Sequence, residues 1–146
     1  MQVLWLTAAR AAADKKGIDT VILEVGSVLA ITDAFVITSA SNVRQVRTIA
    51  EEVELQIDGV GGPKPLRIEG LDDARWVLLD YGDFVVHVFL DEARRYYDLE
   101  RLWSDAPRVA WAEAGRSRGR DGDDAGSGRD GREGDEGDQA LDAASS

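Results

Sequence analysis

The sequence predicts an α/β fold, with helices packed against a mixed five-stranded sheet. Apolar residues recur at helical spacing in three stretches and form five shorter runs of strand length. The resulting order is helix, two strands, helix, three strands and helix, which is typical of a sheet with helices packed against it. The length of 146 residues suits one domain with a substantial hydrophobic core.

The stretch of residues 76–103 organises the chain. Its two apolar runs, 76–80 and 84–90, flank a turn at Gly82, and alternating β-branched and aromatic residues around such a turn predict a β-hairpin. A helix is expected to begin at Asp91, where the helix dipole favours negative charge. One face of this helix should dock on the hairpin, and it carries Ala93, Tyr96, Leu99, Leu102 and Trp103.

The N-terminal third predicts one helix and two strands. Residues 3–16 are alanine-rich and end in two lysines before Gly17, which is a helix stop signal. Residues 18–25 form a nearly continuous apolar run, as expected of a central strand covered on both faces. After a break at Gly26, residues 34–39 predict the second strand.

The middle of the chain predicts a helix and a short strand. Ser41 or Asn42 can cap the helix, because both side chains accept hydrogen bonds from early backbone N–H groups. Residues 66–69 alternate apolar and charged side chains and predict a brief third strand. The buried stripe of the helix should consist of Val43, Val46, Ala50, Val53 and Ile57.

The apolar pattern decays from Ala106, which divides the chain into a domain at 1–114 and a tail at 115–146. The tail has eight of the fifteen glycines and one leucine as its only large apolar side chain, so it is predicted to be disordered. Its arginine-glycine pairs resemble RNA-binding segments, but its net charge is negative. Removing its five arginines and nine acidic residues from totals of 17 and 28 leaves the domain at −7.

Charge and composition narrow the class of partner. The whole chain carries a net charge of −11, which repels phosphate backbones and attracts basic partners, so little direct contact with nucleic acid is expected. No apolar run approaches the roughly eighteen residues of a membrane span, and the N-terminus lacks the charge order of a signal peptide. With no cysteine, neither disulfides nor thiolate chemistry arise. We therefore expect a cytoplasmic protein.

An enzymatic interpretation finds few groups to use. The only histidine, His87, cannot form a zinc site without several carboxylates, and no phosphate-binding or nucleophile motif is present. Gly26 and Ser27 with later acids are faintly similar to the signature of nucleotidyltransferases, which requires two acids one residue apart on a strand. Asp80 and Asp83 are three apart across a turn. A metal-dependent enzyme using this pair is the alternative function; otherwise no metal or cofactor is predicted.

Strand alternation instead suggests a binding face. Val77 and Leu79 can both point into the core only if the intervening side chains point the other way. That second face could be an exposed aromatic patch rimmed by charge, as at interaction hot spots, or it could be covered by a helix with Trp76 as an ordinary core residue. The sequence pattern leaves both open. The face would contain Arg67, Glu69, Trp76, Leu78, Asp80, Val85, His87 and Phe89.

Four segments of the chain resemble the bacterial ribosomal silencing factors, relatives of plant Iojap. They are residues 14–25, 31–53, 68–70 and 76–103, in the family's order and spacing. The tail lies outside this pattern. The most specific matches are Trp76, Asp80-Tyr81-Gly82-Asp83, Val86-His87, Tyr97 and Leu102-Trp103.

The resemblance implies a function that composition does not. Members of this family bind the large ribosomal subunit through its fourteenth ribosomal protein, block joining of the small subunit and lower translation during starvation. The mechanism is steric, and an acidic module with an aromatic patch suits a basic protein set among phosphates. The family fold resembles nucleotidyltransferases without their catalytic acids, and some relatives are homodimers when free.

The resemblance also implies contact residues. Trp76 and Tyr81 would be the aromatic anchors, both exposed, and Asp80 and Asp83 would meet cations of the partner. Exposed charge pairs contribute only about 0–1 kcal/mol each, so the aromatic residues should dominate the affinity and the acids the rate of association. The complete predicted contact set is Glu69, Trp76, Asp80, Tyr81, Asp83, His87 and Tyr97.

Overall fold

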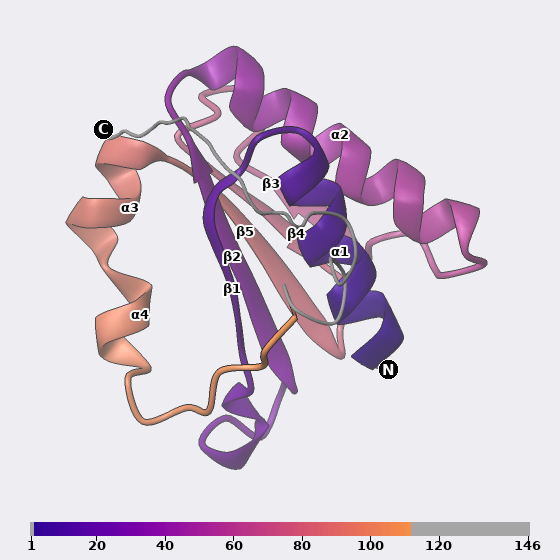
Figure 1. The fold of residues 1–146 in the computed structure, drawn as a ribbon, viewed down its shortest axis with the longest axis vertical. Helices are drawn as coiled ribbons and strands as arrows, with labels where there is room; N and C mark the ends of the chain where they lie inside the picture. Colours follow the sequence, from indigo (N-terminus) through magenta and orange to yellow (C-terminus); the bar gives the residue numbers. More distant parts are fainter. Residues whose placement is uncertain (1, 112–146) are drawn as a thin grey trace, which may run out of the picture. The chain divides into compact units, whose positions relative to one another are not determined.

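The computed structural model describes residues 2–111 (Figure 1). The predicted disorder of residues 115–146 lies outside this part of the chain. Within it, no helix is both long and apolar enough to cross a lipid bilayer. The elements in order are α1 (Gln2–Asp14), β1 (Ile18–Leu23), a short 3₁₀ helix (Val25–Ser27), β2 (Ala34–Ala40), α2 (Val43–Gly59), β3 (Arg67–Glu69), β4 (Trp76–Asp80), β5 (Phe84–Leu90), α3 (Asp91–Tyr97) and α4 (Leu99–Leu102).

The five strands form one mixed sheet, as predicted, and their order in the sheet is β1-β2-β5-β4-β3. β2 and β5 run parallel, and the other neighbouring pairs are antiparallel. β4 and β5 are the two arms of the predicted hairpin. Gly82 has a φ of +86° in its turn, a value that costs glycine little because it lacks a Cβ. β2 is buried along its whole length because β1 and β5 flank it and helices cover its faces.

Helices cover the two faces of the sheet separately (Figure 1). α1 and α2 pack side by side on one face, over Val77 and Leu79 of β4. α3 packs on the other face, where Ala93 joins Phe35 of β2 and Phe89 of β5 in a second, smaller core. The first face is thus closed by two long helices, whereas the second is covered only by short ones.

The predicted features of α2 are largely confirmed. Asn42 is the N-cap, and its side-chain oxygen accepts a hydrogen bond of 2.8 Å from the backbone N–H of Gln45. Ile49 joins the predicted stripe, while Val43 at the first turn is exposed. The buried residues of α2 are Val46, Ile49, Ala50, Val53 and Ile57.

The prediction that residues 18–25 form a central strand is wrong, because β1 is an edge strand that ends at Leu23. Its first half, including Asp19, is exposed, and its last two residues are buried. Residues 107–109 run along the outer edge of that buried half: the N–H of Glu24 donates to the Pro107 carbonyl at 2.8 Å. Residues 107–109 therefore cover the outer edge of β1, which explains why the second half of this edge strand is apolar.

The apolar pattern also extends further towards the C-terminus than Ala106. The Trp111 side chain is buried in the core under α1, and its Nε1 donates a hydrogen bond of 2.9 Å to the carbonyl of Thr20. The N–H of Val109 donates to the carbonyl of Ile22 at 2.9 Å. Residues 106–111 are therefore part of the folded domain rather than a transition to the tail.

Candidate functional site

The sheet face that carries α3 is the candidate functional site, and we call it the outer face. Strand alternation and register place Trp76, Leu78 and Asp80 of β4 on it. Leu78 pairs with Glu69 of β3 on one side and with His87 of β5 on the other. Val77 and Leu79 are fully buried on the opposite face, as the alternation predicted.

Trp76 is a partly exposed residue at the centre of an aromatic cluster. Its indole stacks on Phe89 with the ring centroids 4.9 Å apart, and Tyr97 packs against it at 4.7 Å. Its Nε1 donates a hydrogen bond of 3.0 Å to Nδ1 of His87. The two alternatives left open by the sequence are thus both partly right: α3 contributes to packing around Trp76 but leaves part of the indole accessible.

His87 is buried beneath this cluster and is not itself a contact surface. The side chain has an exposed fraction of 4%, and Phe35 meets it edge-on at 4.7 Å. Burial lowers the pKa of His87 from 6.5 to about 4, so the imidazole is neutral near pH 7. Because Nδ1 accepts from Trp76, the ring proton lies on Nε2. His87 holds the orientation of Trp76 from below.

Tyr97 and its neighbour Tyr96 form the most exposed aromatic pair next to Trp76. Tyr97 ends α3 and is 50% exposed, and Tyr96 is 80% exposed with its ring edge-on to Tyr97 at 5.0 Å. Tyr97 was among the predicted contact residues. Tyr96 was expected on the docked face of the helix, and its exposure corrects that expectation.

A helix break at Asp98 changes which of the later predicted residues dock on the sheet. The predicted helix is interrupted at Asp98, which has a φ of +50°, and α4 begins at the next residue with a changed direction. Leu102 is consequently 70% exposed, whereas Leu99 and Trp103 pack against the smaller core. Aspartate is a poor residue for a helix interior and adopts the left-handed conformation more readily than most residues, and this is the sequence signal for the break.

Tyr81 does not lie on the outer face of the sheet. It is 6% exposed in the core under α1 and α2, and its ring stacks on Phe84 at 4.7 Å. Burial, with a smaller effect of the Glu54 carboxylate, raises the pKa of Tyr81 to about 12. The expectation of an exposed Tyr81 anchor is therefore wrong. The turn directs this side chain to the helical face because it follows Asp80, which points outwards.

The three predicted acidic contact residues differ in availability. Both oxygens of Asp80 are engaged: Oδ1 accepts from the Gly82 N–H at 2.9 Å, and Oδ2 pairs with Nε of Arg67 at 3.2 Å. Glu69 also pairs with Arg67, at 3.3 Å, but both side chains are more than half exposed. Asp83 is exposed at the hairpin turn and forms no ion pair within residues 2–111. Asp80 thus stabilises the hairpin turn. Because both of its oxygens already have partners, it is a poor metal ligand, which argues against the alternative function of a metal-dependent enzyme using Asp80 and Asp83.

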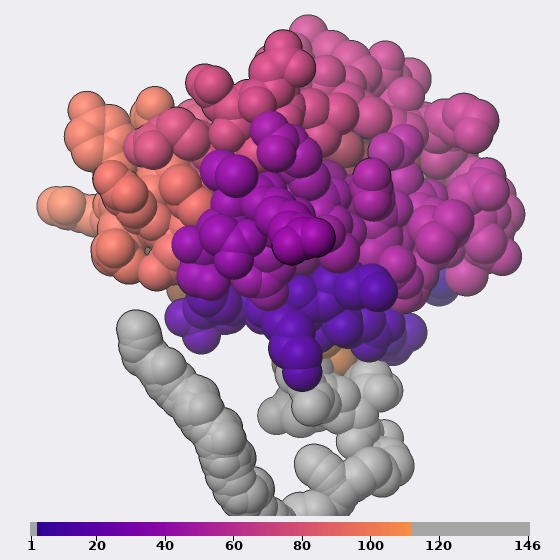
Figure 2. Space-filling view, turned by 90° about the horizontal axis from the view of Figure 1, so that it is seen from above, coloured from indigo at the N-terminus to yellow at the C-terminus, as the bar shows by residue number. Residues whose placement is uncertain are grey.

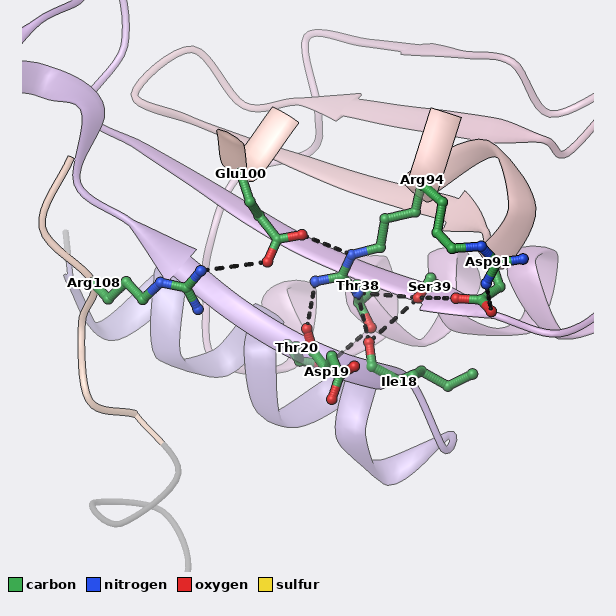
Figure 3. Close-up of polar contacts among 10 residues, drawn as sticks. Ile18, Asp19, Thr20, Thr38, Ser39, Asp91, Arg94, Glu100 and Arg108 are labelled. Atoms are coloured by element: carbon green, nitrogen blue, oxygen red, sulfur yellow. Dashed lines mark hydrogen bonds and ion pairs between the residues drawn. The ribbon is translucent and has the colours of Figure 1, made fainter. Parts of the chain in front are cut away.

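A buried arginine fixes α3 against the sheet (Figure 3). Arg94 is buried, and its guanidinium donates to the carbonyls of Ile18 at 2.8 Å and Asp19 at 2.7 Å. It also donates to the hydroxyl of Ser39 at 3.0 Å and pairs with Glu100 of α4 at 3.0 Å. These contacts connect β1, β2, α3 and α4. They position Tyr97 over Trp76, a role that the sequence analysis did not assign.

Comparison with known proteins identifies the family. The model of a family described as "Ribosomal silencing factor during starvation" matches residues 2–138, and so extends into the tail that was expected to lie outside the family's pattern. The chain is 44% identical over 100 residues to a ribosomal silencing factor of Bacillus subtilis, covering 68% of this chain and 84% of that protein. It is 30% identical over 88 residues to the mouse protein named "Mitochondrial assembly of ribosomal large subunit protein 1", covering 59% and 39%.

The fold comparison agrees with the sequence comparison. A crystal structure of a Chromobacterium violaceum protein superposes with a TM-score of 0.68 at 33% identity, covering 71% of this chain and 86% of that one. The chain belongs to the family of ribosomal silencing factors.

Proposed function

We propose that this protein binds the large ribosomal subunit through a basic ribosomal protein, the fourteenth of that subunit, and sterically blocks joining of the small subunit when nutrients are limiting. Membership of the silencing-factor family supports this proposal, as does the name of the mouse relative. No chemical step is needed, because occupation of the subunit interface suffices.

One observation carries the choice of surface. The outer face presents Trp76 and Tyr97 as a packed, partly exposed aromatic pair, with the carboxylate of Glu69 at its edge. Rigid aromatic side chains surrounded by charge are typical of interaction hot spots, since they bury much area at little entropic cost. A standard interface hides roughly 800 Å² on each partner, which a domain of this size can supply.

The proposed contact set differs from the predicted one in three respects, the first being that the buried Tyr81 is left out. Trp76, Tyr97, Glu69 and Asp83 would touch the partner directly. His87 and Asp80 would act indirectly, by holding Trp76 and the hairpin turn in place. Tyr96 is added because it extends the exposed aromatic surface of Tyr97.

The test is co-sedimentation with purified ribosomal subunits at graded salt. The parent protein should sediment with large subunits and not with small ones, and binding should weaken as salt screens the acidic rim. Tyr97→Ala should weaken binding by about 2 kcal/mol while leaving the thermal midpoint almost unchanged, because half of its side chain is exposed. Undiminished binding by a folded Tyr97→Ala variant would contradict the assignment of this face.

A further inference from the structure

A second candidate surface lies on the opposite side of the sheet, between α2 and β3. A hollow of about 500 Å³ there has an apolar floor whose accessible surface comes from Ile68 of β3 and from Leu71, above the buried Ala50 and Leu79. A smaller hollow of about 230 Å³, lined by Leu55, adjoins the same helix. The two share Glu51 and Glu54, so they follow one another along α2.

The rim of these hollows is acidic. Glu51, Glu54 and Asp72 line the larger hollow, and Asp58 lines the smaller one. None of the four carboxylates forms an ion pair or accepts a side-chain hydrogen bond within residues 2–111. Their oxygens are therefore not occupied by these side chains and can accept hydrogen bonds from a ligand.

The nearby cations do not neutralise this rim. The guanidinium of Arg47 is directed to backbone carbonyls, those of Leu71 at 3.1 Å and Asp72 at 2.6 Å. These bonds hold the loop that forms one wall of the larger hollow. Lys64 is the single lysine lining the smaller hollow, against three carboxylates. An anionic ligand would be repelled here, whereas a cationic one would be attracted.

The apolar floor adds a second requirement. Burying Leu71, which is partly exposed, and the exposed Leu55 requires apolar groups in the ligand as well as positive charge. Because the two hollows lie in sequence along a helix, a single small molecule would fill only one of them. A polypeptide segment with both basic and apolar side chains matches the charge, the floor and the length.

We infer that the α2–β3 groove is a docking site for a basic polypeptide segment that carries apolar side chains. This site is separate from the outer face, since α2 and α3 cover opposite faces of the sheet. Figure 2 shows the residues of α2 and those of α3 on opposite sides of the molecule. The protein can therefore hold a basic segment at the groove while the outer face is occupied by another partner.

The test uses a fluorescein-labelled synthetic peptide of alternating lysine and leucine, with binding followed by fluorescence anisotropy near physiological salt. A peptide of alternating lysine and serine is the matched probe without apolar side chains. The double variant Glu51→Gln with Glu54→Gln should bind the lysine-leucine peptide about fivefold more weakly than the parent. The control variant, Glu92→Gln with Asp105→Asn, makes the same change in net charge away from the groove and should change binding less than about twofold.

A third variant tests the floor separately. Leu71→Ser should weaken binding of the lysine-leucine peptide about threefold and leave binding of the lysine-serine peptide unchanged. Only the lysine-leucine peptide has apolar side chains that can contact Leu71. If the double variant does not fold, the Leu71→Ser measurements alone test whether the peptide binds in the groove. Equal losses in the groove and control variants would show attraction by net charge alone and overturn the proposal. So would equal binding of the two peptides to the parent.

Binding to large subunits distinguishes this site from the outer face. The groove variants should co-sediment with large subunits as the parent does. Loss of that binding would place the ribosome contact in the groove and overturn the separation of the two sites. Conversely, if Tyr97→Ala fails to weaken subunit binding, the proposed function needs a different surface while the groove measurements stand unaffected.

Discussion

At the scale of single residues, the hydrogen bond between Trp76 and His87 is the feature on which the outer face depends. It joins a partly exposed indole to a buried imidazole over 3.0 Å and fixes both rings. Removing one partner leaves the other without its hydrogen bond in a largely dry environment, which is costlier than the bond itself. This pair therefore links stability to the shape of the binding surface.

Trp76→Phe tests the bond directly. The phenyl ring keeps most of the stacking on Phe89 but cannot donate to His87, so the free energy of unfolding should fall by about 1–3 kcal/mol. Urea denaturation measures this change. Trp103→Phe is the control, because the Trp103 indole N–H makes no hydrogen bond with residues 2–111, and its effect should be smaller. An equal loss in both variants would assign the cost to ring size alone.

His87 also predicts a pH dependence of stability. Its pKa is about 4 in the folded protein and 6.5 when exposed, so the unfolded chain binds a proton first as the pH falls. The stabilisation is complete above pH 6.5 and is lost as the pH decreases towards about 4, by roughly 3 kcal/mol in total.

The measurement compares the parent with His87→Asn across this range. Carboxylates titrate at its lower end in both proteins, so the difference between the two curves isolates the histidine. His87 is the only histidine in the chain, which makes that difference specific. A parent curve parallel to that of the variant between pH 6.5 and 5 would show that His87 is not buried in neutral form.

At the scale of elements, the long regular ones were predictable and the short ones were not. α2 and the β4–β5 hairpin follow from apolar periodicity and from cap and turn residues such as Asn42 and Gly82. The division at Asp98 was missed because the apolar spacing continues across it. The burial of Tyr81 was missed because a turn residue was expected to be exposed, whereas strand alternation continues to that position.

Arg94 explains why α3 is held although it is only seven residues long. Its guanidinium reaches two carbonyls, a hydroxyl and a carboxylate, a set of acceptors that needs the planar, multiple donors of arginine. Sequence periodicity could not reveal this role of Arg94, because a charged residue in a helix is normally assigned to the solvent face.

Arg94→Lys should therefore destabilise the protein by at least about 2 kcal/mol, because lysine cannot reach all of these acceptors at once. The neighbouring Arg95 is exposed, and within residues 2–111 its one ion pair is with Asp91 one turn away, so Arg95→Lys should stay within about 0.5 kcal/mol of the parent. Thermal and urea unfolding compare the two. Equal effects would deny the special role of the buried guanidinium.

At the scale of the whole molecule, residues from the two ends of the domain depend on each other. The segment 106–111 closes the edge of β1, and Trp111 fills the core under α1. Two truncations test this arrangement. A chain ending at Ala114 should keep the thermal midpoint and subunit binding of the parent. A chain ending at Asp105 should lose at least about 3 kcal/mol, as for removal of a core tryptophan.

The two truncations also test the role of the tail. Loss of subunit binding by the chain that ends at Ala114 would give residues 115–146 a function that their composition does not predict. An unchanged thermal midpoint for the chain that ends at Asp105 would contradict the packing of Trp111.

The folded domain of residues 2–111 carries the two proposed binding surfaces on opposite faces of one sheet. The outer face presents aromatic residues to the proposed ribosomal partner, and the groove along α2 presents carboxylates. The family identity was accessible from the sequence because its matches extend along most of the domain, whereas the groove was not, because α2, β3 and the loop at Leu71 converge only in the folded chain.

The central claim is that the outer face blocks subunit joining, and light scattering during the mixing of purified small and large subunits tests it most directly. Large subunits preincubated with the parent protein should give a much reduced rise in scattering. Tyr97→Ala should restore joining at the same protein concentration, while Val3→Ala, a control at an exposed position of α1, should block it as the parent does. Full blocking by a folded Tyr97→Ala variant, or normal joining in the presence of the parent protein, would contradict the account.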